Sequence, residues 1–314
     1  MPSPIVAAHS DLLDRIGGTP LLRLGRIARR FGGLPAGVEV CAKAEHLNPG
    51  GSVKDRTARA IVLDAERRGA LHPGRILLDA TSGNTGIAYA MIGAARGYGV
   101  TVCLPRNASV ERKRLLAAYG ARIVETDPLT GTDGAQEAAR ALAAESPALY
   151  FHANQYDNPA NWRAHYETTG PEIRDQTGGR VTHFVAALGT SGTFVGTARA
   201  LKQFDPRVHV TSVQPDGPLH GLEGMKHMAT ARVPGIWDPT VADAEAVVST
   251  ADAQATTRAL ARDEGLLVGV SAGANVFAAF ALARVLPAGS LVVTILCDTG
   301  ARTLSEPFWL EGDA

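Results

Sequence analysis

Short apolar segments alternate with amphipathic ones along most of this chain, and this alternation limits the possible fold more than any other feature. One series runs from residue 75 to 145 and a second from 182 to 298. Short β-rich runs separated by helices are typical of parallel sheets with helices on both faces. The 314 residues, 45% of them hydrophobic, suffice for two modest cores that share an interface. The sequence therefore predicts an α/β fold with two lobes, each a mostly parallel, twisted sheet.

The charge and cysteine content narrow the possible partners. Thirty-one basic residues balance 31 acidic ones, so no overall field attracts nucleic acid or an anionic membrane. The sequence contains no signal-peptide pattern and no uninterrupted apolar stretch of spanning length. Cys41, Cys103 and Cys297 lie far apart and outside any CxxC spacing, which favours buried thiols over ligands or a bridge. We expect a soluble, cytoplasmic protein that binds small molecules and neither nucleic acid, membrane nor metal.

Three turns that follow predicted strands share a composition of Gly, Ser and Thr. They occupy residues 81–86, 189–196 and 269–274, and a helix is predicted after each. Ligands of open α/β sheets bind at the carboxyl ends of strands, and backbone N–H groups at a helix N-terminus stabilise an anion. A single turn of this kind is ordinary, but three in register favour an anion site. None carries GxxxxGK[ST] or GxGxxG with its acidic residue, which disfavours an NTPase or a dehydrogenase.

The stretch LNPGGSVKDR, residues 47–56, places Lys54 at the start of a predicted helix. A helix N-terminus carries partial positive charge and disfavours an ammonium group there, so the position suits a lysine that reacts. Lysine forms a Schiff base with a carbonyl, and backbone amides hold phosphate. The combination predicts a cofactor that bears both a carbonyl and a phosphate.

Five motifs in this order, NPGGSVKDR, TSGNTG, GTSGT, GVSAGA and CDTGARTLS, resemble the fold-type II pyridoxal-phosphate enzymes of the cysteine synthase and cystathionine β-synthase group. The B-type cysteine synthases (O-acetylserine sulfhydrylases) are the most similar. The resemblance implies pyridoxal 5′-phosphate as cofactor and a homodimer. It also implies a smaller mobile lobe, residues 42–150, and a larger cofactor-binding lobe, residues 10–41 plus 151–306.

The resemblance assigns roles to the matching residues. Lys54 is expected to form the internal aldimine and to move the substrate α-proton, Asn84 to bind the cofactor's 3′ oxygen, and Ser271 to face the pyridine nitrogen. The expected phosphate loop is Gly189, Thr190, Ser191, Gly192 and Thr193, and the expected substrate-carboxylate group is Thr81, Ser82, Thr85 and Gln155. The family often has Gly where this chain has Ser191, which either lends a hydroxyl or crowds the loop. His152, His165 and Tyr166 are expected to be structural.

The implied reaction is β-replacement on an activated L-serine through an aminoacrylate intermediate, with O-acetyl-L-serine and sulfide giving L-cysteine and acetate. A neutral Ser271 at the ring nitrogen favours this chemistry over transamination. The alternatives are cystathionine β-synthase-like condensation, use of O-phosphoserine, cyanide or an amine, and a non-catalytic pyridoxal-phosphate-binding paralogue. Retention of Lys54, Asn84 and Ser271 argues against the last.

Residues 214–228 reach the cofactor cleft in this family and help to choose the second substrate. Relatives that accept anionic substrates carry an Arg pair near here, whereas this chain has Leu222, Glu223, Gly224 and then Lys226 and His227. Without the Arg fork there is no bidentate recognition of phosphate. We therefore expect O-acetylserine to be preferred over O-phosphoserine; the alternative is that Lys226 and His227 are surface residues without influence.

Overall fold

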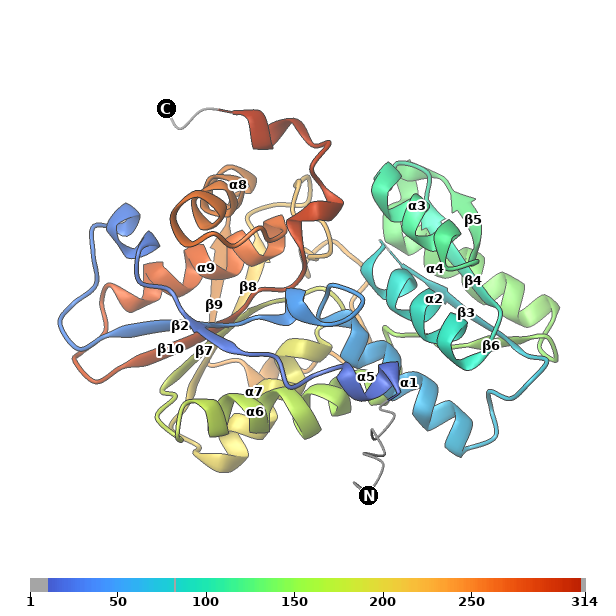
Figure 1. Cartoon of the computed structure of the whole chain (residues 1–314), viewed down its shortest axis with the longest axis horizontal. Coiled ribbons are helices and arrows are strands. Elements are labelled where there is room, and N and C mark those ends of the chain that lie inside the picture. Colours follow the sequence, from blue (N-terminus) through green and yellow to red (C-terminus); the bar gives the residue numbers. More distant parts are fainter. Residues whose placement is uncertain (1–10, 82, 312–314) are drawn as a thin grey trace, which may run out of the picture.

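The computed structural model describes residues 11–81 and 83–311, which form two lobes lying side by side (Figure 1). The larger lobe contains a six-stranded sheet in the order β1-β2-β10-β7-β8-β9, and the smaller contains a four-stranded sheet in the order β5-β4-β3-β6. Neighbouring strands are parallel except β1, which runs antiparallel to β2. The predicted α/β fold with two mostly parallel sheets is confirmed.

The elements have the following bounds. The strands are β1 Leu21–Arg23, β2 Glu39–Lys43, β3 Ile76–Ala80, β4 Val100–Pro105, β5 Arg122–Thr126, β6 Tyr150–His152, β7 His183–Ala187, β8 His209–Pro215, β9 Ala244–Val248 and β10 Leu291–Ile295. The α-helices are α1 Lys54–Arg67, α2 Asn84–Arg96, α3 Val110–Ala118, α4 Gly131–Glu145, α5 Pro159–Ala164, α6 Gly170–Gln176, α7 Gly192–Phe204, α8 Thr250–Ala259 and α9 Val270–Ala283. π-helical turns cover His165–Thr169 and Leu260–Glu264. Short 3₁₀ helices cover Leu12–Arg15, Ile27–Phe31, Glu45–Leu47, Pro128–Thr130, Pro239–Val241, Gly300–Arg302 and Pro307–Leu310.

The central strands explain why the sequence shows apolar runs rather than alternation. Strands β4 and β10 are buried at every position. A parallel strand covered by helices on both faces has no solvent side on which polar residues would alternate. Removing each Val, Leu or Ile side chain of these strands from water stabilises the fold by about 1.5–3 kcal/mol. Within the described part of the chain no helix is long and apolar enough to cross a membrane.

The lobe boundaries at residues 42 and 150 fall inside strands. Residue 42 lies in β2 of the larger sheet, and residue 150 begins β6 of the smaller sheet. Judged by the two sheets, the larger lobe therefore extends to at least residue 43 before the smaller lobe begins, and the smaller lobe extends to at least residue 152. Helix α1 packs against α2 of the smaller lobe and against α5, which itself packs against α7 of the larger lobe. That the smaller lobe moves is still a prediction.

A buried ion cluster fixes the start of α1 to the larger lobe. Nε of Arg56, in the first turn of α1, lies 2.7 Å from Oε2 of Glu45, and Nη1 of Arg56 lies 2.7 Å from Oε1 of Glu172 in α6. Nζ of Lys43 lies 2.6 Å from Oε2 of the same Glu172. Two cations and two carboxylates thus compensate one another where water is largely excluded. The first turn of α1 is anchored to residues on both sides of it in sequence.

Candidate active site

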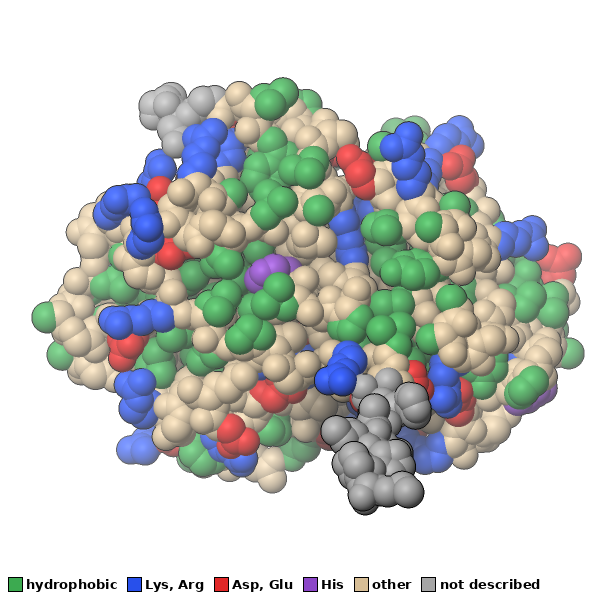
Figure 2. All heavy atoms as spheres, in the orientation of Figure 1, with side chains coloured by type: hydrophobic (Ala, Val, Ile, Leu, Met, Phe, Trp, Pro, Cys, Tyr) green, Lys and Arg blue, Asp and Glu red, His purple; other side chains and the backbone are tan. Residues whose placement is uncertain are grey.

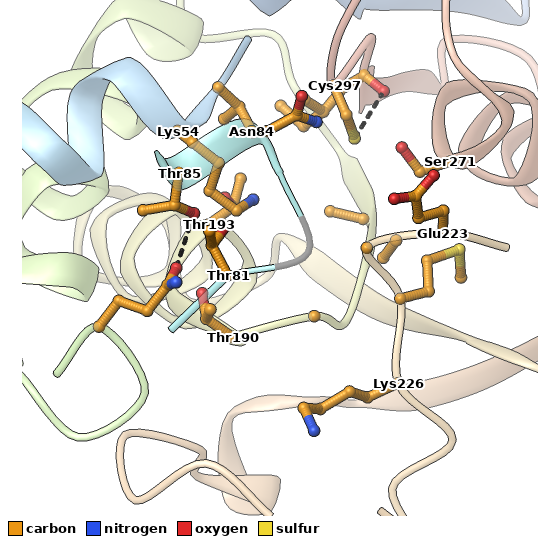
Figure 3. A pocket seen from close by; sticks show the side chains of 18 of the residues that line it. Lys54, Thr81, Asn84, Thr85, Thr190, Thr193, Glu223, Lys226, Ser271 and Cys297 are labelled. Atoms are coloured by element: carbon orange, nitrogen blue, oxygen red, sulfur yellow. Dashed lines mark hydrogen bonds between the residues drawn. The ribbon is translucent and has the colours of Figure 1, made fainter. Parts of the chain in front are cut away.

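A cleft of about 820 Å³, including its open mouth, lies where the two lobes meet. Its walls come from both sheets, and Figure 3 shows the side chains around it. The cleft is lined by most of the predicted site residues, which are Lys54, Thr81, Asn84, Thr85, Gln155, Gly189, Thr190, Thr193 and Ser271. Ser191 and Gly192 lie in the same turn as Gly189 but are not among the lining residues. Ser82 lies outside the described residues.

Lys54 is the first residue of α1 and points into the cleft (Figure 3). Burial lowers the pKa of its ammonium group below the usual value, and the nearby Cys297, Asp298 and Glu45 oppose that shift only in part. A lowered pKa increases the share of neutral amine, which is the nucleophilic form. The structure therefore brings Lys54 into the cleft with a lowered pKa, and its reaction with a carbonyl group stays a prediction.

The turn before Lys54 has no room for larger residues. A Cβ on Gly50 would lie 2.6 Å from Oδ1 of Asp55, whose Oδ2 accepts a hydrogen bond of 2.5 Å from the Gly50 N–H. Gly51 has φ +77°, a left-handed conformation that favours glycine. Nη2 of Arg302 donates a hydrogen bond to the Gly50 carbonyl. These contacts explain the two consecutive glycines in the sequence: they set the direction in which α1 begins.

The turn Gly189–Thr193 forms a cradle at the N-terminus of α7. A Cβ on Gly189 would lie 2.2 Å from the Gly224 carbonyl oxygen, and a Cβ on Gly192 would lie 2.0 Å from Oδ1 of Asn161. Ser191 has φ +69°, a conformation that costs a non-glycine residue about 1–2 kcal/mol. Its hydroxyl oxygen is buried and has no hydrogen-bond partner among the described residues. A cradle of this kind with an unsatisfied hydroxyl fits a phosphate group.

Two side chains behind the cradle hold it in place. Asn161 donates from Nδ2 to the Thr190 hydroxyl, at 3.0 Å, and to the Gln155 carbonyl, at 2.7 Å. His165 is fully buried, and its Nε2 lies 3.3 Å from the Thr193 hydroxyl. Burial lowers the pKa of His165 to about 3, so the ring is neutral at physiological pH. His165 thus contacts the back of the cradle and does not line the cleft.

The predicted carboxylate-binding residues lie together on the smaller-lobe side. Thr85 donates a hydrogen bond of 2.7 Å from its hydroxyl to Oε1 of Gln155, whose Nε2 donates to the Ala80 carbonyl at 2.6 Å. The Thr81 hydroxyl accepts hydrogen bonds from the N–H groups of Gly83, at 2.9 Å, and Gly86, at 3.3 Å. Thr81 therefore shapes the turn, and Thr85 and Gln155 present a linked pair of polar groups.

Asn84 contacts two residues that the sequence analysis did not single out. Its Nδ2 donates a hydrogen bond of 2.7 Å to Oδ2 of Asp298, and its Oδ1 accepts one from Nη1 of Arg302. Both partners come from CDTGARTLS, a motif that carried the resemblance but in which no residue received a role. The motif marks this stretch as part of the family resemblance. Only the fold shows that Asp298 and Arg302 orient the side chain of Asn84.

Ser271 and Cys297 form the wall opposite the carboxylate-binding residues (Figure 3). The Cys297 sulfur accepts a hydrogen bond of 3.3 Å from Nδ2 of Asn275 and donates one of 3.8 Å to the Ile295 carbonyl. Burial raises the pKa of the Cys297 thiol to about 11, so the thiol is neutral. All three cysteines are free; Cys103 is fully buried, whereas Cys41 and Cys297 are only partly buried, so the expectation of buried thiols holds in full for Cys103 and in part for the other two.

Residues 223–226 also line the cleft. The Lys226 side chain is only 7% exposed and its Nζ lies 2.9 Å from Oδ1 of Asp133. The alternative that Lys226 is a surface residue is therefore wrong. His227 is half-buried, does not line the cleft, and its Nδ1 lies 2.9 Å from the Thr230 hydroxyl.

A cleft between two mostly parallel sheets, with a lysine of lowered pKa, a glycine-rich turn at a helix N-terminus and a hydroxyl on the opposite wall, is typical of the pyridoxal-phosphate enzymes of fold type II. The family described as pyridoxal-phosphate dependent enzymes matches residues 12–298, and the chain belongs to it. A cysteine synthase of Aquifex aeolicus is 45% identical over 99% of this chain and 95% of its own length. The O-ureido-L-serine synthase of Streptomyces lavendulae is 40% identical over 94% and 91%. The crystal structure of a cysteine synthase from Entamoeba histolytica superposes with a TM-score of 0.91, at 34% identity, over 100% of this chain and 94% of that one.

Proposed function

We propose that this protein makes L-cysteine and acetate from O-acetyl-L-serine and sulfide by β-replacement. The observation that carries the proposal is that Lys54, with its lowered pKa, faces a wall formed by the hydroxyl of Ser271. A neutral partner at the cofactor ring suits β-elimination and replacement better than transamination. The identity of 45% with a cysteine synthase, over nearly the whole chain, supports the same reaction.

The residues of the cleft fit pyridoxal 5′-phosphate. When bound, that group supplies an aldehyde for a Schiff base and a ring that accepts electrons from the substrate's α-carbon. Lys54 would hold it covalently, the backbone amides of residues 189–193 and the Ser191 hydroxyl would hold its phosphate, and Ser271 would face the ring nitrogen.

The chain's own residues then bind the substrate and move protons. Thr85, Gln155 and the N–H groups of the 81–86 turn would bind the substrate carboxylate, next to the N-terminus of α2. The neutral amine of Lys54, once free, would take the proton from the substrate's α-carbon and return it at the end of the reaction. Closing the cleft would keep water from the reactive carbon.

A second candidate differs in the nucleophile. The relative from Streptomyces lavendulae is named for another product, O-ureido-L-serine, although it is 40% identical to this chain. This similarity means that the same cleft is compatible with cysteine formation and with other β-replacements, including condensation with homocysteine. The nucleophile therefore has to be tested directly.

The experiment is a spectral titration followed by product analysis. The purified protein is titrated with O-acetylserine, O-phosphoserine and serine while its visible absorbance is followed, and a panel of sulfide, homocysteine, cyanide and hydroxyurea is then added. We expect O-acetylserine to change the spectrum and sulfide to restore it with release of cysteine. Absence of cysteine under these conditions, with another product formed from the panel, would replace the proposal by the corresponding β-replacement.

We further propose a homodimer located in the cytoplasm, as the family resemblance implies. The balance of 31 basic and 31 acidic residues supports the absence of a nucleic-acid partner. Light scattering on the purified protein measures the oligomeric state, and a mass of one chain at micromolar concentration would contradict the homodimer.

A further inference from the structure

Two ion pairs of opposite polarity join the lobes beside the cleft. In one, Lys226 of the larger lobe pairs with Asp133 of α4 in the smaller lobe, at 2.9 Å. In the other, Glu223 of the larger lobe pairs with Arg112 of α3 in the smaller lobe. Figure 2 shows basic and acidic side chains at the groove between the two lobes. Each pair therefore connects the two lobes through a residue that lines the cleft.

The segment that carries Glu223 and Lys226 is attached directly to the phosphate cradle. The Lys226 N–H donates a hydrogen bond of 2.8 Å to the Leu188 carbonyl, at the residue before the cradle begins. The Gly224 carbonyl lies so close to Gly189 that a Cβ there would be 2.2 Å away. Nζ of Lys226 also lies 5.4 Å from the centre of the Tyr156 ring. These contacts hold Lys226 against the cleft whether or not its ion pair is formed.

The cations in this region are already neutralised. Of the described residues that line the cleft, Lys54 and Lys226 carry the amino groups, and Lys54 is taken by the cofactor in the proposed function. The charge of Lys226 is balanced by Asp133, whose Oδ2 accepts a further hydrogen bond of 3.0 Å from the Arg232 N–H. The buried Arg112 is balanced by Glu223, whose side chain is 41% exposed and lines the cleft. An anionic leaving group would therefore meet one compensated lysine and one carboxylate.

We propose that Asp133 and Glu223 determine donor specificity, because Asp133 neutralises Lys226, which would otherwise receive an anionic leaving group, and the Glu223 carboxylate lines the cleft and repels such a group. Together they make the cleft select a serine derivative with an uncharged leaving ester and reject a phosphate ester. The inference rests on the proposed β-replacement and extends it to residues outside the family motifs. Asp133 does not touch the reacting atoms, so it acts through Lys226 as a positioning and charge-setting residue.

The test compares two donors in the holoenzyme. The ratio of kcat/KM for O-phosphoserine to that for O-acetylserine is measured with sulfide in wild type, Asp133→Asn, and Asp133→Asn combined with Lys226→Met. In Asp133→Asn the ratio should rise roughly tenfold, about the effect of one charge-assisted hydrogen bond. In the double variant the gain should disappear, because the released cation is gone. Glu125→Gln, which breaks the Lys113–Glu125 pair of 2.6 Å within the smaller lobe, is the matched control and should leave the ratio unchanged.

The ratio separates specificity from a purely structural role. If Asp133 served only to hold the lobes together, its loss would weaken turnover of both donors equally, and an unchanged ratio overturns the proposal. Glu223→Gln should shift the ratio in the same direction; if it does not, Glu223 has no part in donor choice. If Glu223→Gln does not fold because Arg112 has lost its partner, the Asp133 variants still test the proposal.

A binding measurement distinguishes this inference from the proposed function. Inorganic phosphate is titrated into the holoenzyme, whose cofactor phosphate already fills the cradle, and the shift in thermal unfolding temperature is recorded. Asp133→Asn should bind phosphate roughly tenfold more tightly than wild type, and the double variant should not. Equal binding in all three proteins contradicts the inference even if cysteine is formed. If wild type makes no cysteine but the three proteins bind phosphate as expected, the proposed reaction is wrong. The inference that Asp133 neutralises Lys226 then still holds.

Discussion

Asn84 begins helix α2 in the smaller lobe, and its amide donates a hydrogen bond of 2.7 Å to the carboxylate of Asp298, which follows the last strand of the larger lobe. This contact joins the two lobes at the base of the cleft. It fixes the rotation of a side chain that the family resemblance assigns to the cofactor's 3′ oxygen. We therefore expect Asp298 to set the orientation in which Asn84 would meet the cofactor.

Replacing Asp298 with Ala should lower kcat/KM for O-acetylserine roughly tenfold or more, since a charge-assisted hydrogen bond contributes about 1.5–3 kcal/mol. Asp298→Asn keeps an acceptor oxygen and should lose less. Steady-state kinetics and the position of the cofactor's visible absorbance band provide the two readouts. A band and a rate unchanged in Asp298→Ala would mean that Asn84 is positioned without its partner.

Lys54→Ala should abolish turnover and the yellow colour of the purified protein, because the change removes both the Schiff-base amine and the group that moves the α-proton. Lys113→Ala, which alters a lysine outside the cleft, is the control and should keep both. The assay is cysteine formation together with a visible spectrum. Wild-type turnover in Lys54→Ala would rule out the assignment of the catalytic lysine.

Ser191→Gly should have opposite effects on the empty and the cofactor-bound protein. Glycine adopts φ +69° without penalty, so the cofactor-free protein should gain up to about 1 kcal/mol in free energy of unfolding. The cofactor should dissociate faster, because the buried hydroxyl is lost from the cradle. Urea unfolding of the cofactor-free protein and dialysis of the holoenzyme measure the two effects. Slower dissociation in the variant would show that Ser191 crowds the phosphate instead of binding it.

Acid should destabilise the fold through Glu172. Burial alone would raise the pKa of this carboxyl, but hydrogen bonds and charge from Arg56 and Lys43 lower it to about 2 from the usual 4.5. A carboxyl whose pKa is lower in the folded state stabilises the protein above its unfolded pKa, and this contribution is lost as the pH falls from about 4.5 to about 2. The contribution amounts to roughly 3 kcal/mol at neutral pH.

Urea unfolding of wild type and Glu172→Gln between pH 3 and pH 7 tests this prediction. The two proteins should differ most at pH 7 and converge in acid. If the difference in free energy of unfolding between the two proteins stays constant across this range, other carboxyl groups cause the pH dependence of stability. Glu125→Gln, which alters an exposed ion pair, should leave the stability nearly unchanged across this pH range.

The sequence predicted the sheets well because buried parallel strands impose an unbroken apolar pattern that local residues reveal. It predicted the cleft because the turns after such strands meet at one edge of each sheet. It missed Asp298, Arg302, Arg112 and Asp133, since these act through contacts between distant parts of the chain; Asn84 and Asp298 are 214 residues apart. No local pattern distinguishes a carboxylate that pairs across the cleft from one that is solvated. The sequence likewise does not show that Lys226 is buried, because its burial depends on contacts with distant residues such as Asp133.

The ion cluster around Arg56 ties the beginning of α1 to the larger lobe, and the cradle at residues 189–193 belongs to the same lobe. Both proposed attachment points of the cofactor, the Lys54 amine and the phosphate site, are therefore tied to the larger lobe. The Thr85 turn sits on the other. A rotation of the smaller lobe would then change the distance from Thr85 to a bound substrate more than the distance between the two proposed anchors of the cofactor. If the smaller lobe moves as predicted, the cleft would open for exchange of amino acids while the cofactor keeps both of its proposed attachments.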